Sequence, residues 1–159
     1  MDLLPKLAQK VGDCLITVGA TLVTAESCTG GLLGSVITDI PGSSAYYRGG
    51  VISYSNELKI QLLGVETYCL ERFGAVSQET VTQMAEGIRK QTGATYALAT
   101  SGIAGLGGGT ATKPVGLVYI GLAGPRGTRT SENRFSGCRR EIKVQTVQAA
   151  LEMLIDLFS

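Results

Sequence analysis

Compact apolar segments alternate with amphipathic helical patterns along most of this chain of 159 residues. Residues 21–27, 50–55 and 95–101 are short apolar runs, each of the length of a buried strand. Apolar residues at helical spacing fill the segments between them, so helices separate the strands in order. This alternation favours a sheet that is mostly parallel and is covered by helices on both faces.

The remaining elements complete a single domain over residues 1–159. Residues 117–123 and 128–135 form a predicted hairpin around a Gly-Pro-Arg-Gly turn. Asn56 is the expected N-cap of the helix that follows the second strand. We therefore expect a three-layer α/β/α fold with a mixed, mostly parallel sheet. The predicted helices lie at 3–18, about 29–40, 57–64, 66–74, 77–91 and about 139–157.

Composition argues against several classes of partner. The chain has 14 basic and 13 acidic residues and a net charge of +1, which argues against nucleic acid and anionic membranes. No apolar stretch is long enough to span a bilayer, and the first residues lack the pattern of a signal peptide. Four scattered cysteines suggest neither a zinc site nor a disulfide framework. We expect a cytoplasmic protein with reduced thiols.

The chain contains no histidine, and this absence restricts any catalytic mechanism. It excludes Ser-His-Asp and Cys-His catalysis within one chain, and it removes the commonest metal ligand. Unless a cofactor or a partner chain supplies another group, the base of an enzyme must be Lys, Asp, Glu, Tyr or water.

A candidate nucleophile stands where the first strand meets the next helix, in the segment TAESCTGG at 24–31. Backbone N–H groups at a helix start favour anions, so Ser27 would lie beside a ready-made oxyanion hole. Gly30 and the glycine after it would let a substrate approach the backbone closely. The alternative is that Ser27 or Thr29 only caps the helix.

Lys59 is the natural candidate for the base of Ser27 in a chain without histidine. It follows the strand at 50–55, and neighbouring parallel strands end at the same edge of a sheet. Burial would lower the pKa of its amine and favour the neutral form that accepts a proton. Tyr54, at the end of the same strand, could relay a proton or stack on a flat ring. The alternatives are a surface helix lysine and a core tyrosine.

Two further segments could hold an anion. Successive glycines in the loop at 102–116 can form a nest of N–H groups, although the complete Walker and dinucleotide-binding patterns are absent. Arg139 and Arg140 open the last helix, where a basic side chain opposes the helix dipole and suits an external phosphate or carboxylate. A flexible connection and a solvated basic turn are the respective alternatives.

An ordered set of motifs resembles the CinA C-terminal domain family. The set comprises TAESCTGG at 24–31, DIPGSS at 39–44, GGVISYSNELK at 49–59, GAVS at 74–77, SGIAG through KPVG at 101–116, and FSGCR at 135–139. The resemblance covers nearly the whole chain and implies the three-layer fold. Two positions depart from the family pattern: Leu106 stands where proline is common, and Cys138 stands where an acid often precedes the arginine.

The family includes bacterial nicotinamide-nucleotide amidases, so the resemblance implies hydrolysis of nicotinamide mononucleotide to nicotinate mononucleotide and ammonia. We expect no metal and no organic cofactor. The resemblance gives Ser27 the role of nucleophile, gives Lys59 that of general base, and places Tyr54 near the lysine. The residues expected at the oxyanion and the substrate are Cys28, Thr29, Gly30, Ser44, Ser101, Gly102 and, for the phosphate, Arg139.

The expected partner is a small-molecule nucleotide substrate, and no nucleic acid or membrane partner is expected. A homo-oligomer is expected, with a dimer as the first hypothesis. The rival hypothesis for the function is a catalytically silent nucleotide-binding regulatory domain of the competence or damage-inducible type. The presence of both Ser27 and Lys59 favours the enzyme.

Overall fold

Five strands form one mixed sheet in the computed structural model, which describes residues 3–159. β1 pairs in parallel with β2 and with β3, whereas the β3–β4 and β4–β5 pairs are antiparallel. The order across the sheet is therefore β2-β1-β3-β4-β5, with the parallel part around β1. The strands are β1 (Leu22–Glu26), β2 (Tyr47–Ile52), β3 (Tyr96–Gly102), β4 (Leu117–Gly124) and β5 (Gly127–Arg134).

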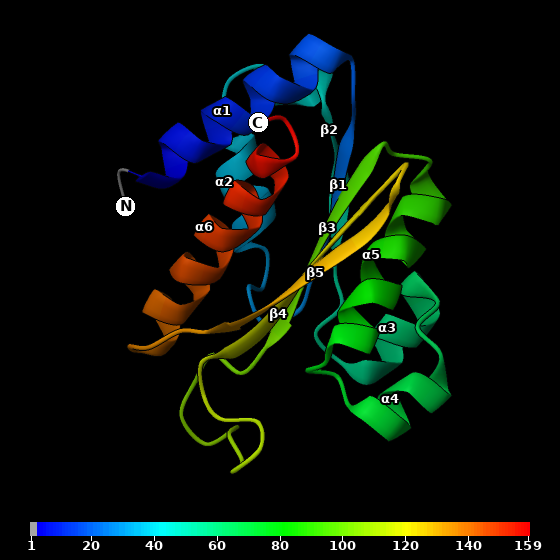
Figure 1. The fold of residues 1–159 in the computed structure, drawn as a ribbon, viewed down its shortest axis with the longest axis vertical. Coiled ribbons are helices and arrows are strands. Elements are labelled where there is room, and N and C mark those ends of the chain that lie inside the picture. Colours follow the sequence, from blue (N-terminus) through cyan, green and yellow to red (C-terminus); the bar gives the residue numbers. More distant parts are fainter. Residues whose placement is uncertain (1–2) are drawn as a thin grey trace.

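Helices cover both faces of the sheet and give the molecule three layers (Figure 1). The predicted three-layer α/β/α fold with a mixed sheet is confirmed. Within residues 3–159, none of the helices is long and apolar enough to cross a bilayer. One face carries α1 (Leu3–Val18), α2 (Leu32–Thr38) and α6 (Arg139–Asp156). The other carries α3 (Asn56–Leu63), α4 (Thr67–Phe73) and α5 (Gln78–Thr92), and a short 3-10 helix, η1 (Ser43–Ala45), precedes β2.

Alternate side chains of the central strands contribute to two separate apolar cores. Leu22 of β1 and Leu98 of β3 belong to the core under α1, α2 and α6. Val23 and Ala25 of β1 belong to the core under α5. All residues of β1 are buried, and a strand that is covered on both faces and paired on both edges cannot shift without disrupting both cores. β1 therefore holds the residues that follow it in a fixed position.

Two local predictions need correction. β2 spans 47–52 instead of 50–55, because the chain leaves the sheet after Ile52 and turns into α3. The Ser55 hydroxyl accepts a hydrogen bond from the Leu58 N–H at 3.1 Å, so Ser55 and not Asn56 is the N-cap of α3. The turn between β2 and α3 therefore begins at Ser53, and α3 begins at Asn56, one residue earlier than predicted.

Gly87 lets α5 approach the end of α3 closely. A Cβ atom at this position would collide with the backbone carbonyl of Leu63, the last residue of α3. Leu63 is itself buried in the same core as Met84 and Ile88 of α5. The absence of a side chain at Gly87 is therefore a packing requirement of the layer that carries Lys59.

We expect Gly87→Ala to lower the free energy of unfolding by about 1–3 kcal/mol, because overpacking outweighs the ~1 kcal/mol that alanine normally adds to a helix. Urea denaturation followed by circular dichroism measures this change. Lys90→Ala, at an exposed position of the same helix, is the control and should alter stability by less than about 0.5 kcal/mol. A Gly87→Ala protein that is more stable than the wild type would contradict the close approach.

Candidate active site

The carboxyl ends of β1, β2 and β3 meet at one edge of the sheet. The Ser27 N–H donates a hydrogen bond to the Thr100 carbonyl at 3.0 Å, and the Ser53 N–H donates to the Glu26 carbonyl at 2.8 Å. These contacts continue the strand pairing on each side of β1. Because parallel strands end at the same edge, the residues that follow all three strands are held side by side.

Ser27 and Lys59 form a buried hydrogen-bonded pair at this edge. Lys59 Nζ lies 3.1 Å from Ser27 Oγ, although α3 carries the lysine and the serine follows β1. The Lys59 side chain is 1% exposed and Ser27 is 7% exposed. Nζ also donates hydrogen bonds to the main-chain carbonyls of Ser53 at 2.8 Å and Tyr54 at 3.2 Å. The structure thus brings the predicted pair together, and Lys59 is not a surface lysine.

The surroundings of Lys59 favour its uncharged form. Burial lowers the pKa of the Lys59 amine, and within residues 3–159 no carboxylate forms an ion pair with it. A neutral amine has two N–H bonds and one lone pair, and Nζ has three polar neighbours. The N–H bonds can serve the Ser53 and Tyr54 carbonyls, which leaves the lone pair for the Ser27 hydroxyl. This arrangement suits a base that takes the proton of the serine.

Glu26, the last residue of β1, organises the turn that carries Ser27. Its buried carboxylate accepts a hydrogen bond from the Thr29 hydroxyl at 2.6 Å. It also accepts hydrogen bonds from three backbone N–H groups at the start of α2, where the helix dipole favours a negative charge. Those N–H groups, at 2.9 to 3.2 Å, belong to Gly31, Leu33 and Gly34. Glu26 was not among the predicted site residues, although a carboxylate directly before the serine at a strand end is a signal in the sequence.

Two N–H groups of the turn are not used by Glu26. In the part of the chain that the structure describes, no oxygen atom accepts a hydrogen bond from the N–H of Cys28 or Thr29. The next N–H, that of Gly30, donates to the Ser27 carbonyl at 3.1 Å. These two N–H groups directly follow Ser27 in the chain. Unused N–H groups at such a position can hold a developing negative charge.

Cys28 and Thr29 use their side chains inside the protein. Burial raises the pKa of the Cys28 thiol to about 12, so the thiol stays protonated at neutral pH. The Thr29 hydroxyl donates to Glu26 and lies 2.9 Å from the Thr100 hydroxyl. The oxyanion role predicted for Cys28 and Thr29 is therefore open to their backbone N–H groups and not to their side chains.

Tyr54, Ser101 and Gly102 lie at the same edge, but within residues 3–159 none of them makes a side-chain hydrogen bond to Ser27 or Lys59. Tyr54 is 64% exposed and offers its carbonyl, not its ring, to Lys59, so it is not a core tyrosine. The Ser101 hydroxyl donates to the Ala75 carbonyl at 2.7 Å, which ties β3 to the segment between α4 and α5. Gly102 approaches β4 so closely that a Cβ atom would collide with it. The contacts of these residues are therefore structural: they hold Lys59, the segment before α5 and β4 in place at this edge.

Two cations of α6 reach toward the backbone of this edge. The Arg139 guanidinium lies directly against Gly105, where a Cβ atom would collide with it. Lys143 lies one helical turn further along α6, and its Nζ lies 3.6 Å from the position that a Cβ atom of Gly30 would occupy. Lys143 was missed in the sequence, although its spacing of four residues from Arg139 places both on one face of the helix. Arg139 is thus next to the glycine-rich loop, and Lys143 is next to the Ser27 turn.

Ser44 lies at the opposite edge of the sheet, which corrects its predicted place beside Ser27. It belongs to η1, and the neighbouring Tyr46 carbonyl accepts a hydrogen bond from the Leu22 N–H at the start of β1. Ser27 follows the other end of β1, so the strand of five residues, about 16 Å long, separates the two ends. Within one chain the structure does not bring Ser44 to Ser27, because β2 runs parallel to β1 and Ser44 precedes β2.

Comparisons with known proteins show the family. Residues 4–158 match the family described as the CinA C-terminal domain. A CinA-like protein of Endomicrobium trichonymphae is 51% identical over 148 residues, which are 93% of this chain and 35% of that protein. A CinA-like protein of Cyanothece sp. is 58% identical over 133 residues, which are 84% of this chain and 32% of that protein.

Solved structures agree with the sequence relatives. The crystal structure of the competence/damage inducible protein CihA from Agrobacterium tumefaciens matches with a TM-score of 0.95 at 44% identity, and covers 98% of this chain and 96% of that chain. A competence or damage-inducible protein from Enterobacter asburiae matches with a TM-score of 0.95 at 35% identity, with 98% of each chain covered.

The fold and the site define a three-layer α/β domain with a buried serine–lysine pair at the carboxyl edge of its central strand. The chain belongs to the CinA C-terminal domain family. It spans about a third of the length of the curated relatives it matches, 35% and 32% in the two cases above.

We expect Glu26→Ala to lower the free energy of unfolding by about 2–4 kcal/mol, because it leaves several buried donors at the start of α2 without an acceptor. Glu26→Gln keeps the shape and one acceptor oxygen, so it should cost less. Glu71→Ala, which removes an exposed carboxylate from α4, is the matched control and should be nearly neutral. Denaturant unfolding of the three variants measures the effects, and equal stability of Glu26→Ala and Glu71→Ala would contradict this role of Glu26.

Proposed function

We propose that this domain hydrolyses the carboxamide of nicotinamide mononucleotide to nicotinate mononucleotide and ammonia. Ser27 is the nucleophile and Lys59 is its general base. The observation that carries the proposal is the 3.1 Å contact between Ser27 Oγ and a lysine amine whose pKa is lowered by burial. An uncharged amine beside a hydroxyl is one of the few ways to activate serine in a chain without histidine.

The reaction proceeds through an ester of Ser27. Lys59 Nζ takes the hydroxyl proton while Oγ attacks the carboxamide carbon, and the resulting oxyanion is held by the N–H groups of Cys28 and Thr29. The tetrahedral intermediate then breaks its C–N bond, and Lys59 returns the proton to the departing nitrogen, which leaves as ammonia. A water molecule, deprotonated by Lys59, attacks the ester carbon. The ester breaks to release nicotinate mononucleotide and to regenerate the Ser27 hydroxyl.

The nucleotide phosphate is assigned to Arg139 and Lys143. Both side chains come from the first turns of α6, and they approach the backbone at Gly105 in the glycine-rich loop and at Gly30 in the Ser27 turn. A planar guanidinium and an ammonium group together suit a dianionic phosphate. The phosphate charge also offsets the unfavourable position of two cations near a helix N-terminus. The prediction that a small-molecule nucleotide is the partner rests on this pair.

The rival function is a nucleotide-binding regulatory domain without catalysis. The names of the related proteins favour it, because they refer to competence and damage and not to a reaction. In that case the Arg139 and Lys143 region would bind the nucleotide while Ser27 stayed unmodified. Ammonia release distinguishes the two functions directly. A homodimer and a cytoplasmic location stay predictions.

We expect Ser27→Ala and Lys59→Met each to lower ammonia release from nicotinamide mononucleotide by about 10³-fold or more, because each removes one half of the nucleophile and base pair. Methionine retains the length and apolar character of the buried lysine stem, so Lys59→Met should stay folded. Lys90→Met, at an exposed position of α5, is the control and should keep full activity. Nucleotide binding by the wild type without any ammonia release would favour the regulatory domain.

The pH dependence follows from the state of Lys59. Its pKa is lowered from the usual 10.5 by burial, and only the neutral amine can accept the serine proton. The rate should therefore rise with pH through the lowered pKa of Lys59 and fall away on the acid side, where the amine is protonated. Measurement of kcat/KM across pH tests this limb. Lys59→Arg should be inactive throughout, because a guanidinium does not lose its proton, and an active variant would contradict the mechanism.

A further inference from the structure

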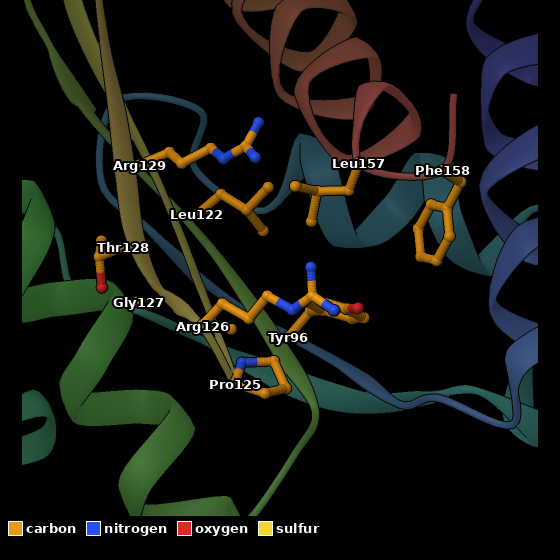
Figure 2. A pocket seen from close by; sticks show the side chains of 10 residues that line it. Tyr96, Leu122, Pro125, Arg126, Gly127, Thr128, Arg129, Leu157 and Phe158 are labelled. Carbon is orange, nitrogen blue, oxygen red and sulfur yellow. The ribbon is translucent and has the colours of Figure 1, made fainter.

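A second concave site lies at the end of the sheet that is remote from Ser27. It is a pocket of about 410 Å³ between the β4–β5 hairpin and the end of α6 (Figure 2). Tyr96, which begins β3, and Gly124, which ends β4, form part of its wall. Ser27 pairs with Thr100 near the other end of β3, four residues or about 13 Å along the strand from Tyr96. The pocket is therefore separate from the candidate active site, and its volume lies in the range of small-molecule sites.

Two arginines supply the charge of this pocket. Arg126 lies in the hairpin turn, and Arg129 lies on β5 opposite Leu122 of β4. Figure 2 shows both side chains extending from the hairpin toward the end of α6. Within residues 3–159 neither of them pairs with a carboxylate or donates a hydrogen bond to another residue. Two guanidinium groups that face one cavity repel each other, so an anion between them is favoured.

The nearby helix end does not account for these cations. The carboxyl end of α6 carries about half a negative charge from its dipole, which attracts basic side chains weakly. The last carbonyls of α6 accept hydrogen bonds from the N–H groups of Leu157 and Phe158, at 3.1 and 2.9 Å, and not from the arginines. The two full positive charges exceed that partial charge. Within residues 3–159 the two guanidinium groups therefore form no ion pair, and a bound anion would supply one.

Rings and apolar side chains supply the other wall. Tyr96 and Phe158 meet edge to face with their ring centroids 5.9 Å apart, and both line the pocket. Tyr96 packs closely on Gly124, where a Cβ atom would collide with its ring, so the ring is held in place. Leu122 and Leu157 add apolar surface beside them. A planar ring of a ligand would find apolar contact and an aromatic edge or face here.

We propose that this pocket binds an organic phosphate monoester with a planar ring, of the class of a nucleoside 5′-monophosphate. The phosphate lies between the guanidinium groups of Arg126 and Arg129, and the ring lies against Tyr96, Phe158 and Leu157. Two cations match the two charges of a phosphate monoester, and the aromatic wall selects a ligand with a ring over free phosphate. The site is independent of the chemistry proposed for Ser27, so it would stand even if that chemistry failed.

Adenosine 5′-monophosphate is a suitable probe, because it has the phosphate and a large planar ring but no carboxamide to hydrolyse. We expect its titration into isotope-labelled protein to shift the NMR signals of Tyr96, Gly127 and Phe158 in a saturable way. Arg126→Gln/Arg129→Gln should weaken this binding by about tenfold or more. Arg134→Gln is the control, because it removes an arginine from the same strand at a position opposite Leu117, outside the pocket.

The comparison ligands make each part of the proposal refutable. Adenosine and inorganic phosphate should both bind much more weakly than the nucleotide, because each lacks one half of the ligand. Equal affinity for inorganic phosphate would overturn the role of the rings, and equal affinity for adenosine would overturn the role of the arginines. Shifts confined to the residues around Ser27 and Gly105, or unchanged affinity in the double arginine variant, would overturn the site itself. Ammonia release by the same variants is measured separately and reports only on the function proposed for Ser27.

Discussion

Burial of an amine that has no anionic partner is the interaction on which the site depends. Lys59 is taken out of water by the layer that α3 and α5 form against the sheet, and a charged amine at that depth is unfavourable. Two main-chain carbonyls and one hydroxyl surround Nζ, which is the set that a neutral amine can satisfy in full. Its pKa is lowered for the same reason. The packing of the helical layer thus lowers the pKa of the amine on which the proposed chemistry depends.

The second half of the site depends on a buried carboxylate. Glu26 binds N–H groups at the start of α2 and so shapes the turn around Ser27. The N–H groups of Cys28 and Thr29 lie outside this set, and within residues 3–159 neither donates a hydrogen bond to an oxygen atom. A helix start is usually described as an anion site by itself, but here most of its donors are already used by the protein. Glu26 therefore determines which N–H groups of the turn have no acceptor within the protein.

The two ends of the sheet carry different sets of functional side chains. The parallel half places Ser27, Ser53 and Ser101 at one edge, together with Arg139 and Lys143 from the start of α6. The antiparallel hairpin carries Arg126 and Arg129 to the other edge, where they and the end of α6 line a pocket (Figure 2). The helix α6 therefore contributes residues to both ends. Its first turns carry Arg139 and Lys143, and its other end leads into Leu157 and Phe158 of the pocket.

The sequence by itself determined the alternation of helices and strands, the absence of an imidazole base, and the choice of Ser27 and Lys59 as candidate residues, because periodicity, composition and ordered motifs are local properties of the chain. Only the tertiary structure decided that Ser44 lies at the opposite edge and that Tyr54 offers a carbonyl instead of its ring. It also decided that Glu26 binds the start of α2, that Lys143 approaches Gly30, and that Arg126 and Arg129 line one pocket. Those outcomes depend on the direction in which a strand runs and on which donors are already satisfied. Both are settled by contacts between residues far apart in the chain, and such contacts leave no periodic signal in the sequence.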